Sequence, residues 1–279
     1  MAGTEMIMWG GTVRSLPLGE QLRVAAAAGC SQLSIAPSDY VRWLGSGVST
    51  ADMLSMAADA GVRLSHLDPL VRWVPDWRSE LPEFPAHIFD YHEDDFFRMA
   101  DALQVTSFTI WGAFAVGKHG FDYLVDHYGS LCERAGRLGL RCDIEFTPIC
   151  GIPDLRTASA IIEASGAPNS GIVFDFWHFM RGDPDLDLLR TVPGERITMV
   201  QVNDAAATVP TGVTLVEDSL FRRCPPGQGA FPVDDIIRAL REIGGLRLAG
   251  PEIFSRDLDA MTADEIGAIS AETISWLRD

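Results

Sequence analysis

Arg141-Cys-Asp-Ile-Glu145 and Gly171-Ile-Val-Phe-Asp175 are two of four apolar segments that decide the fold, since each ends in an oxygen-bearing side chain. The other two are Ile197-Thr-Met-Val-Gln201 and Leu248-Ala-Gly-Pro-Glu252. Each segment leads into a turn and then a helical stretch, which predicts four strands of one parallel sheet. In such a sheet the C-terminal ends of the strands meet at one rim. We therefore expect Glu145, Asp175, Gln201 and Glu252 to lie close together.

Three carboxylates and an amide that meet at one rim would repel one another unless a cation lies between them. Oxygen ligands of this kind suit a hard divalent ion. The four side chains therefore predict one divalent metal ion, Mn²⁺ or Mg²⁺ first, with Co²⁺ and Zn²⁺ as alternatives. Asn203 faces the same side as Gln201 and is an alternative amide ligand.

Strand-like and helical segments alternate along the whole chain. We predict strands at residues 6–9, 32–35, 62–66, 107–111, 141–146, 171–176, 197–202 and 246–253. Eight strand–helix units predict an α/β fold, a (β/α)₈ TIM barrel that forms a single domain over residues 1–279. The alternative is an open doubly wound sheet, which normally carries a Gly-rich nucleotide loop after its first strand. Here Gly10-Gly11-Thr12 follows that strand and does not match the loop.

Two long insertions follow the third and seventh predicted strands. They span residues 68–91, which include Trp73 and Trp77, and residues 204–232. Segments that follow barrel strands lie on the active-site face. We therefore expect both insertions to act as lids.

Composition excludes several classes of partner. The 279-residue chain has a formal net charge of −17, with 39 acidic and 22 basic residues, which opposes binding to nucleic acid or anionic membranes. Lysine is scarce, which favours an unphosphorylated substrate. The five cysteines form no Cys-x-x-Cys pair and predict free thiols. With no signal-like or membrane-spanning stretch, we expect a cytoplasmic protein.

Several further side chains are candidates for substrate contact. His178 lies one turn beyond Asp175, and its imidazole could hydrogen-bond a substrate hydroxyl or carbonyl. Arg223 lies in the second insertion and could hold a substrate oxygen, with Arg222 as the alternative. His66 ends the third strand, and Trp111 ends the fourth and could form part of the pocket wall. Asp143 shares a face with Glu145 one layer deeper, with no role that the pattern explains.

These segments together resemble the xylose-isomerase-like TIM barrels, a sugar isomerase/epimerase superfamily that also contains endonuclease IV. The resemblance covers nearly the whole chain. It rests on Ile144-Glu-Phe-Thr-Pro148, Asp175-Phe-Trp-His178, Val200-Gln-Val-Asn-Asp204, Arg223-Cys-Pro-Pro-Gly-Gln-Gly229 and Pro251-Glu-Ile-Phe-Ser255. Ketose 3-epimerases of this superfamily bind their metal through Glu, Asp, His and Glu. Gln201 departs from that set and is similar to the hydroxypyruvate isomerase branch.

The resemblance implies that Glu145, Asp175, Gln201 and Glu252 bind one divalent metal and that His178 and Arg223 contact the substrate. Glu145 and Glu252 would also be the acid–base pair. The expected activity is that of a metal-dependent isomerase or epimerase, which moves a proton next to the carbonyl of a small polyhydroxylated compound through an enediolate. Barrels of this superfamily often form homo-oligomers.

Two other functions fit the same residues. A lyase or dehydratase, including one that cleaves C-glycosides or keto-glycosides, would lose a leaving group after the proton is removed. The tryptophan-rich insertion would suit a partly aromatic substrate of that kind. A non-catalytic sugar-binding barrel is the third hypothesis.

Overall fold

Eight parallel strands close into a barrel in the computed structural model, which describes residues 3–78 and 89–278. The strands follow one another around the ring in chain order, and β8 pairs with β1 to close it. The strands are β1 (Glu5–Met8), β2 (Gln32–Ile35), β3 (Arg63–Leu70), β4 (Ser107–Trp111), β5 (Arg141–Glu145), β6 (Ser170–Asp175), β7 (Ile197–Val202) and β8 (Leu248–Pro251). The predicted TIM barrel is confirmed.

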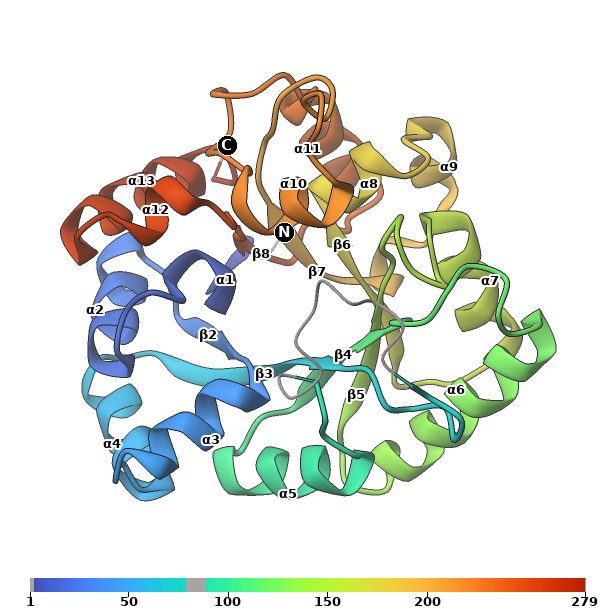
Figure 1. Cartoon of the computed structure of the whole chain (residues 1–279), viewed down its shortest axis with the longest axis horizontal. Helices are drawn as coiled ribbons and strands as arrows, with labels where there is room; N and C mark the ends of the chain where they lie inside the picture. Colours follow the sequence, from blue (N-terminus) through green and yellow to red (C-terminus); the bar gives the residue numbers. More distant parts are fainter. Residues whose placement is uncertain (1–2, 79–88, 279) are drawn as a thin grey trace.

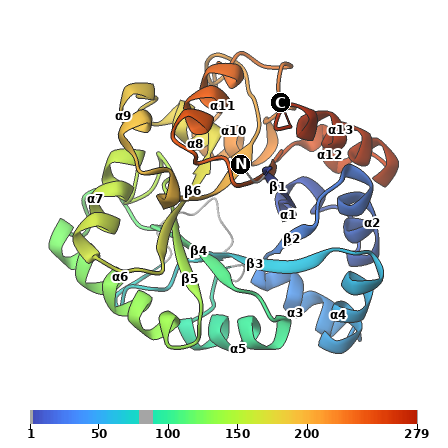
Figure 2. The same ribbon diagram turned by 180° about the vertical axis from the view of Figure 1, so that it is seen from behind.

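Helices form a ring around the barrel, as Figures 1 and 2 show from opposite ends. They are α1 (Gly10–Val13), α2 (Leu18–Ala28), α3 (Pro37–Gly45), α4 (Thr50–Asp59), α5 (Glu93–Leu103), α6 (Phe121–Gly136), α7 (Leu155–Ser165), α8 (Phe176–Arg181), α9 (Leu186–Thr191), the 3₁₀ helix η2 (Gly194–Arg196), α10 (Leu215–Phe221), α11 (Val233–Glu242), α12 (Arg256–Asp259) and α13 (Ala263–Ser275). Among the described residues, none of these helices has the length and apolar character needed to span a bilayer.

Local sequence explains where the elements begin and end. All five residues of β4 are buried, as expected for a strand with packing on both faces. Ser49 caps α4 in a capping box with Asp52, and Gly29 ends α2 with a left-handed φ of 87°. These signals depend on a few neighbouring residues, so they can be read from the chain alone.

The structure differs from the predicted elements mainly at the C-terminal ends of the strands. Strand β3 continues to Leu70 rather than ending at His66, so Asp68 belongs to a strand and not to the first insertion. The part of that insertion at residues 79–88 lies outside the described residues. The second insertion contains α10, and short helices α1, α8 and α12 follow β1, β6 and β8. The helix α3, with Pro37 in its first turn, was also missed.

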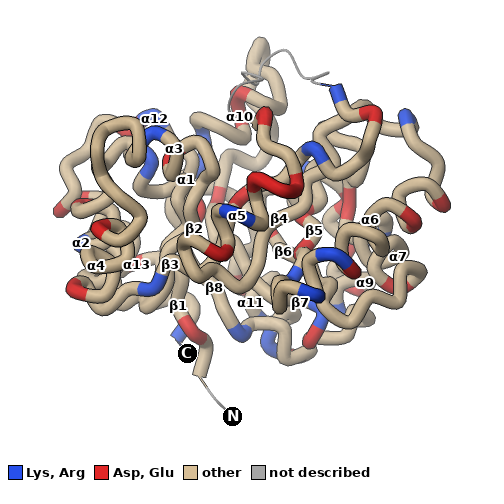
Figure 3. Tube along the Cα trace, turned by 90° about the horizontal axis from the view of Figure 1, so that it is seen from below, with Lys and Arg blue, Asp and Glu red and all other residues tan. Residues whose placement is uncertain are grey.

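The interior of the barrel below the rim holds a buried polar layer. His66 is fully buried and bonds through Nδ1 to Ser107 Oγ and through Nε2 to Thr109 Oγ1, each at 2.7 Å. Asp143 is also fully buried, 3.2 Å from the Arg141 guanidinium. In Figure 3 the N-terminus and β1 lie at the bottom of the molecule and α10 at the top, so the C-terminal ends of the strands face upward.

Candidate active site

A cavity of about 630 Å³ opens at the C-terminal ends of the barrel strands. Glu145, His178, Arg223 and Glu252 line it, together with the aromatic side chains of Phe89, Trp111, Phe221 and Phe254. Both expected insertions contribute: Phe89 from the first, and Thr214 to Arg223 from the second. Of the predicted site residues, Glu145, His178, Arg223, Glu252 and Trp111 therefore line a cavity at the expected end of the barrel.

Three buried carboxylates converge below this cavity. Glu145 is the last residue of β5, Asp175 is the last of β6, and Glu252 follows β8 directly. They are 7%, 0% and 3% exposed. Each therefore reaches the rim because its strand ends there, as the four apolar segments predicted.

Glu145, Asp175 and His178 form a group that could hold a metal ion, because one potential ligand atom from each lies within 4.8 Å of the other two. Asp175 caps α8, since its Oδ1 accepts a hydrogen bond of 2.8 Å from the His178 backbone N–H. This cap fixes where the first turn of α8 places the imidazole. His178 Nε2 lies 3.7 Å from Glu145 Oε1. His178 was predicted to contact substrate, and its position also makes it a candidate metal ligand.

Gln201 connects the metal candidates to Glu252. It lies beside Asp175 in the β6–β7 register, and its Nε2 donates a 3.0 Å hydrogen bond to Glu252 Oε1. Its side-chain oxygen, Oε1, is buried and has no hydrogen-bond partner among the described residues. A buried acceptor without a partner is costly. A cation bound at this point would satisfy it.

Arg223 is buried between two of the carboxylates. Its Nη1 donates to Asp175 Oδ2 at 2.8 Å and to Glu252 Oε2 at 3.1 Å, while Nε and Nη2 bond to Ser219. Asn203 also donates to Asp175 Oδ2, at 2.9 Å. The Arg223 guanidinium, which was expected to hold substrate, is thus largely hydrogen-bonded within the protein. Arg223 still lines the cavity and fixes the Glu252 carboxylate.

Burial and mutual repulsion set the protonation of these groups. Burial raises the pKa of Glu145 well above its usual range, and the charges of Asp68 and Asp175 raise it further. Burial also raises the pKa of Glu252, and Glu145 adds to this although Arg223 opposes it. At Asp175, burial acts in the same direction, but Arg223 and His178 outweigh it and lower the pKa. The cluster therefore favours protons or a metal ion over uncompensated negative charge.

Burial lowers the pKa of His178 to about 4, so its imidazole is neutral near pH 7. A neutral imidazole has a lone pair to offer a metal ion. Carboxylate oxygens, an unpartnered amide oxygen and a neutral imidazole fit a divalent cation. The residues present thus suit a metal site.

Of the other residues predicted to contact substrate, Trp111 lines the cavity and His66 does not. Trp111 lines the cavity, and its Nε1 donates to Thr147 Oγ1 at 2.8 Å. His66 does not line the described part of the cavity, because its ring lies deeper in the barrel between Ser107 and Thr109. Trp73 and Trp77 also do not line it. Their indole N–H groups bond to the Trp111 and Ala113 carbonyls instead.

Asp68 is a cavity residue that sequence reasoning missed. It lies near the end of β3 and lines the cavity, and its Oδ1 is buried with no hydrogen-bond partner among the described residues. The missed signal is that His66 and Asp68 share a face of one strand. The strand was predicted to end too early for this to be seen.

The sequence matches the xylose isomerase-like TIM barrel family over residues 22–279. The chain belongs to this family. In a comparison of structures, the crystal structure of the IOLI protein with a bound zinc atom has a TM-score of 0.83 at 20% identity and covers 98% of each chain. D-psicose 3-epimerase from Clostridium cellulolyticum H10, solved with D-tagatose, has a TM-score of 0.70 at 14% identity and covers 99% of this chain and 98% of that one. At these identities, the two likenesses concern the fold.

Curated relatives fall into two kinds of enzyme. An inosose isomerase of Bacillus velezensis is 30% identical over 51% of this chain and 50% of its own length. A 3-dehydroshikimate dehydratase of Pseudomonas putida is 26% identical over 94% of this chain and 40% of its own length. The match therefore spans half or less of these relatives.

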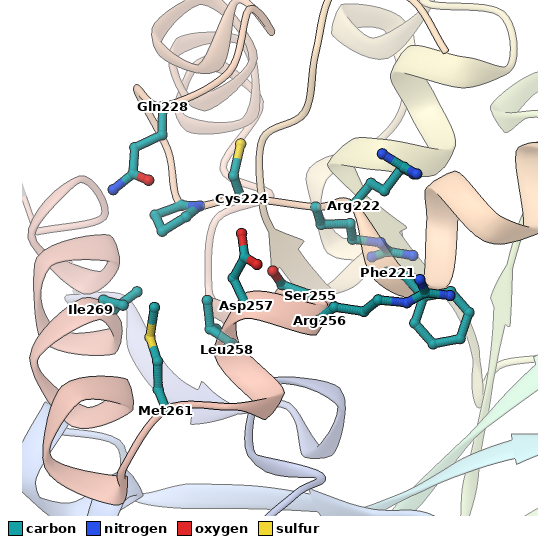
Figure 4. A pocket seen from close by; sticks show the side chains of 12 residues that line it. Phe221, Arg222, Cys224, Gln228, Ser255, Arg256, Asp257, Leu258, Met261 and Ile269 are labelled. Carbon is teal, nitrogen blue, oxygen red and sulfur yellow. The ribbon is translucent and has the colours of Figure 1, made fainter. Parts of the chain in front are cut away.

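Arg223 also lines a second cavity, of about 400 Å³. Figure 4 shows Gln228, Met261 and Ile269 on one side of it and Phe221 and Arg222 on the other. Cys224 lines it, and burial raises the pKa of this thiol to about 11. All five cysteines are free thiols, as predicted, and Cys224 is a weak nucleophile.

Proposed function

We propose that this protein is a divalent-metal-dependent isomerase that moves a proton beside the carbonyl of a polyhydroxylated ketone. The observation that carries the proposal is the convergence of Glu145, Asp175 and Glu252 with His178 and the unpartnered Gln201 oxygen at the base of one cavity. Paired carboxylates with raised pKa values are suited to general acid–base chemistry. The inosose isomerase relatives support the same class of reaction.

Glu145, Asp175 and His178 would hold the metal, with Gln201 and Glu252 as further ligands. When bound, such an ion polarises a carbonyl and makes the neighbouring C–H bond more acidic. The oxygen-rich set favours Mn²⁺ or Mg²⁺. His178 adds a ligand that Zn²⁺ accepts readily, and the IOLI structure contains zinc. We therefore keep Mn²⁺ and Mg²⁺ first and Zn²⁺ and Co²⁺ as alternatives.

The protein's own groups divide the proton transfer between two carboxylates. Gln201 and Arg223 each donate to a different oxygen of Glu252, which orients this carboxylate beside the cavity. Such a fixed carboxylate suits the removal of a proton from carbon. The pKa values of both Glu145 and Glu252 are raised well above their usual range, so Glu145 is suited to return the proton that Glu252 removes. Arg223 would keep the Glu252 carboxylate in place, and its guanidinium does not need to bind substrate through all of its N–H groups.

The second candidate is a dehydratase or lyase on the same site. The observation that favours it is the similarity to 3-dehydroshikimate dehydratases, which extends over 94% of this chain. The aromatic residues around the cavity would accept a larger or unsaturated substrate. After Glu252 removes the proton, a neighbouring hydroxyl or glycosidic group would depart in place of proton return.

One experiment tests the proposed reaction and separates it from the second candidate. The purified protein, loaded with Mn²⁺, would be incubated with scyllo-inosose or 3-dehydroshikimate in D₂O and followed by NMR and mass spectrometry. An isomerase exchanges a C–H proton for deuterium and otherwise conserves mass. Loss of water or of a leaving group would favour the dehydratase or lyase. Neither exchange nor loss with any of the four metals would contradict both and leave the sugar-binding hypothesis.

A further inference from the structure

Asp68 is the end point of a chain of hydrogen bonds that rises from the interior of the barrel. Ser107 Oγ contacts His66 Nδ1, and His66 Nε2 contacts Thr109 Oγ1, both at 2.7 Å. Thr109 in turn hydrogen-bonds to the Asp68 side chain. The buried side chains of Ser107, His66 and Thr109 thus orient one carboxylate at the rim.

The direction of these hydrogen bonds is fixed when Asp68 is ionised. Thr109 must donate its proton to the carboxylate, so Thr109 Oγ1 accepts from His66 Nε2–H and Ser107 donates to His66 Nδ1. Burial lowers the pKa of His66 to about 3, which is consistent with a neutral ring. This network ends at the Asp68 side chain. The carboxyl oxygen Oδ1 is buried and has no hydrogen-bond partner among the described residues, although Asp68 lines the cavity.

The charges around the cavity oppose an anionic ligand. Only two arginines line its described part, and both are paired. Arg14 bonds to both carboxylate oxygens of Asp259 at 2.9 and 2.6 Å, and Arg223 bonds to Asp175 and Glu252. Residues 79–88 contain no lysine or arginine in their sequence.

Four carboxylates face this one inner guanidinium: Asp68, Glu145, Asp175 and Glu252. A carboxylate or phosphate group on the substrate would therefore find no unpaired guanidinium in the described part of the cavity to receive it. A hydroxyl group can instead donate a hydrogen bond to Asp68.

We propose that Asp68 contacts the substrate on the β3 side of the cavity, where Oδ1 accepts a hydrogen bond from a hydroxyl of a neutral polyhydroxylated cyclic ketone. This inference rests on the proposed function and adds the charge class of the substrate to it. Thr109 and His66 are positioning residues for this contact. A neutral ketone such as an inosose fits the site, whereas a keto acid such as 3-dehydroshikimate is disfavoured.

Calorimetry on the Mn²⁺-loaded protein tests this inference, with scyllo-inosose and 3-dehydroshikimate as probes. We expect wild type to bind scyllo-inosose at least about tenfold more tightly than 3-dehydroshikimate. Asp68→Asn should weaken scyllo-inosose binding about ten- to hundredfold, because it removes a charged hydrogen-bond acceptor. The matched control is Asp264→Asn, since Asp264 is an exposed aspartate that pairs with Arg23 and does not line the cavity. Its affinity should equal that of wild type.

The positioning role has its own variants. Thr109→Val removes the hydroxyl that orients Asp68 and should weaken scyllo-inosose binding severalfold, while Thr109→Ser should restore it. Metal content and thermal stability measured on each variant separate a local effect from misfolding. Equal loss in Thr109→Val and Thr109→Ser would show that packing, not the hydroxyl, matters and would overturn the positioning role.

Three outcomes overturn the inference about Asp68. If Asp68→Asn binds scyllo-inosose as tightly as wild type does, Asp68 does not contact the substrate. If wild type binds 3-dehydroshikimate more tightly than scyllo-inosose, the substrate does not have to be neutral. Both can occur while deuterium exchange continues, so they leave the proposed function intact. If wild type binds neither probe and exchanges no deuterium in either, the inference and the proposed function fail together.

Discussion

Gln201 donates a 3.0 Å hydrogen bond from Nε2 to Glu252 Oε1, while its own side-chain oxygen is buried without a partner among the described residues. The amide therefore holds a carboxylate with one end and offers an acceptor with the other. Arg223 holds the second oxygen of the same carboxylate. Glu252 is thus oriented by two donors before any ligand enters.

Glu252→Gln should preserve the fold and lower the rate of C–H exchange about 100- to 10,000-fold, because an amide cannot take up the proton. The measurement is loss of the ¹H signal of scyllo-inosose in D₂O with Mn²⁺-loaded protein. Glu217→Gln is the control, since Glu217 lines the cavity but pairs with Arg222. Exchange at the wild-type rate in Glu252→Gln would rule out the acid–base role.

Asp175→Asn should abolish metal binding. Asp175 is part of the group that could hold the ion, and the substitution removes its charge while keeping its shape. Mass spectrometry of the metal content should give about one divalent ion per chain for wild type and Glu217→Gln, and far less for Asp175→Asn. Circular dichroism checks that α8 survives. A wild type that contains no metal and takes up no added Mn²⁺ would contradict the metal site.

His66 should make the folded protein less stable as the pH falls. Burial lowers its pKa from 6.5 to about 3, so between these values the unfolded chain binds a proton that the folded chain does not. The free energy of unfolding should therefore fall by up to about 1.4 kcal/mol per pH unit from this group below pH 6.5. Urea unfolding of wild type and His66→Gln between pH 7 and 4.5 measures it. Identical slopes for the two proteins would show that His66 is charged when folded.

Gly250→Ala should prevent proper closure of the barrel. A Cβ atom at this position would lie 1.6 Å from the Ile7 carbonyl oxygen, which belongs to the neighbouring strand β1. We expect a loss of roughly 3 kcal/mol or more in the free energy of unfolding, or insoluble protein. Gly267→Ala in α13 is the matched control, because nothing lies within 4 Å of its Cβ. This control should be stabilised by up to about 1 kcal/mol. Equal stability of the two variants would mean that the β8–β1 contact is wrong.

The fold could be predicted largely because its signals are local. Strands β2, β4 and β7 have the bounds that the sequence predicted. Short helices such as α8 and α12 were missed, since they have too few turns to show a helical period. The end of β3 was placed too early, because Asp68-Pro69 is not typical of a strand interior.

The sequence by itself determined the barrel and the rim at which Glu145, Asp175, Gln201 and Glu252 meet, because strand ends and side-chain alternation follow from the order of residues. Only the tertiary structure decided which of them approach one another. It placed His178 beside Glu145, engaged Arg223 with Asp175 and Glu252, buried His66 below the rim and brought Asp68 into the cavity. These outcomes depend on distances between side chains of different strands, and such distances are set by closure of the sheet and packing of its interior.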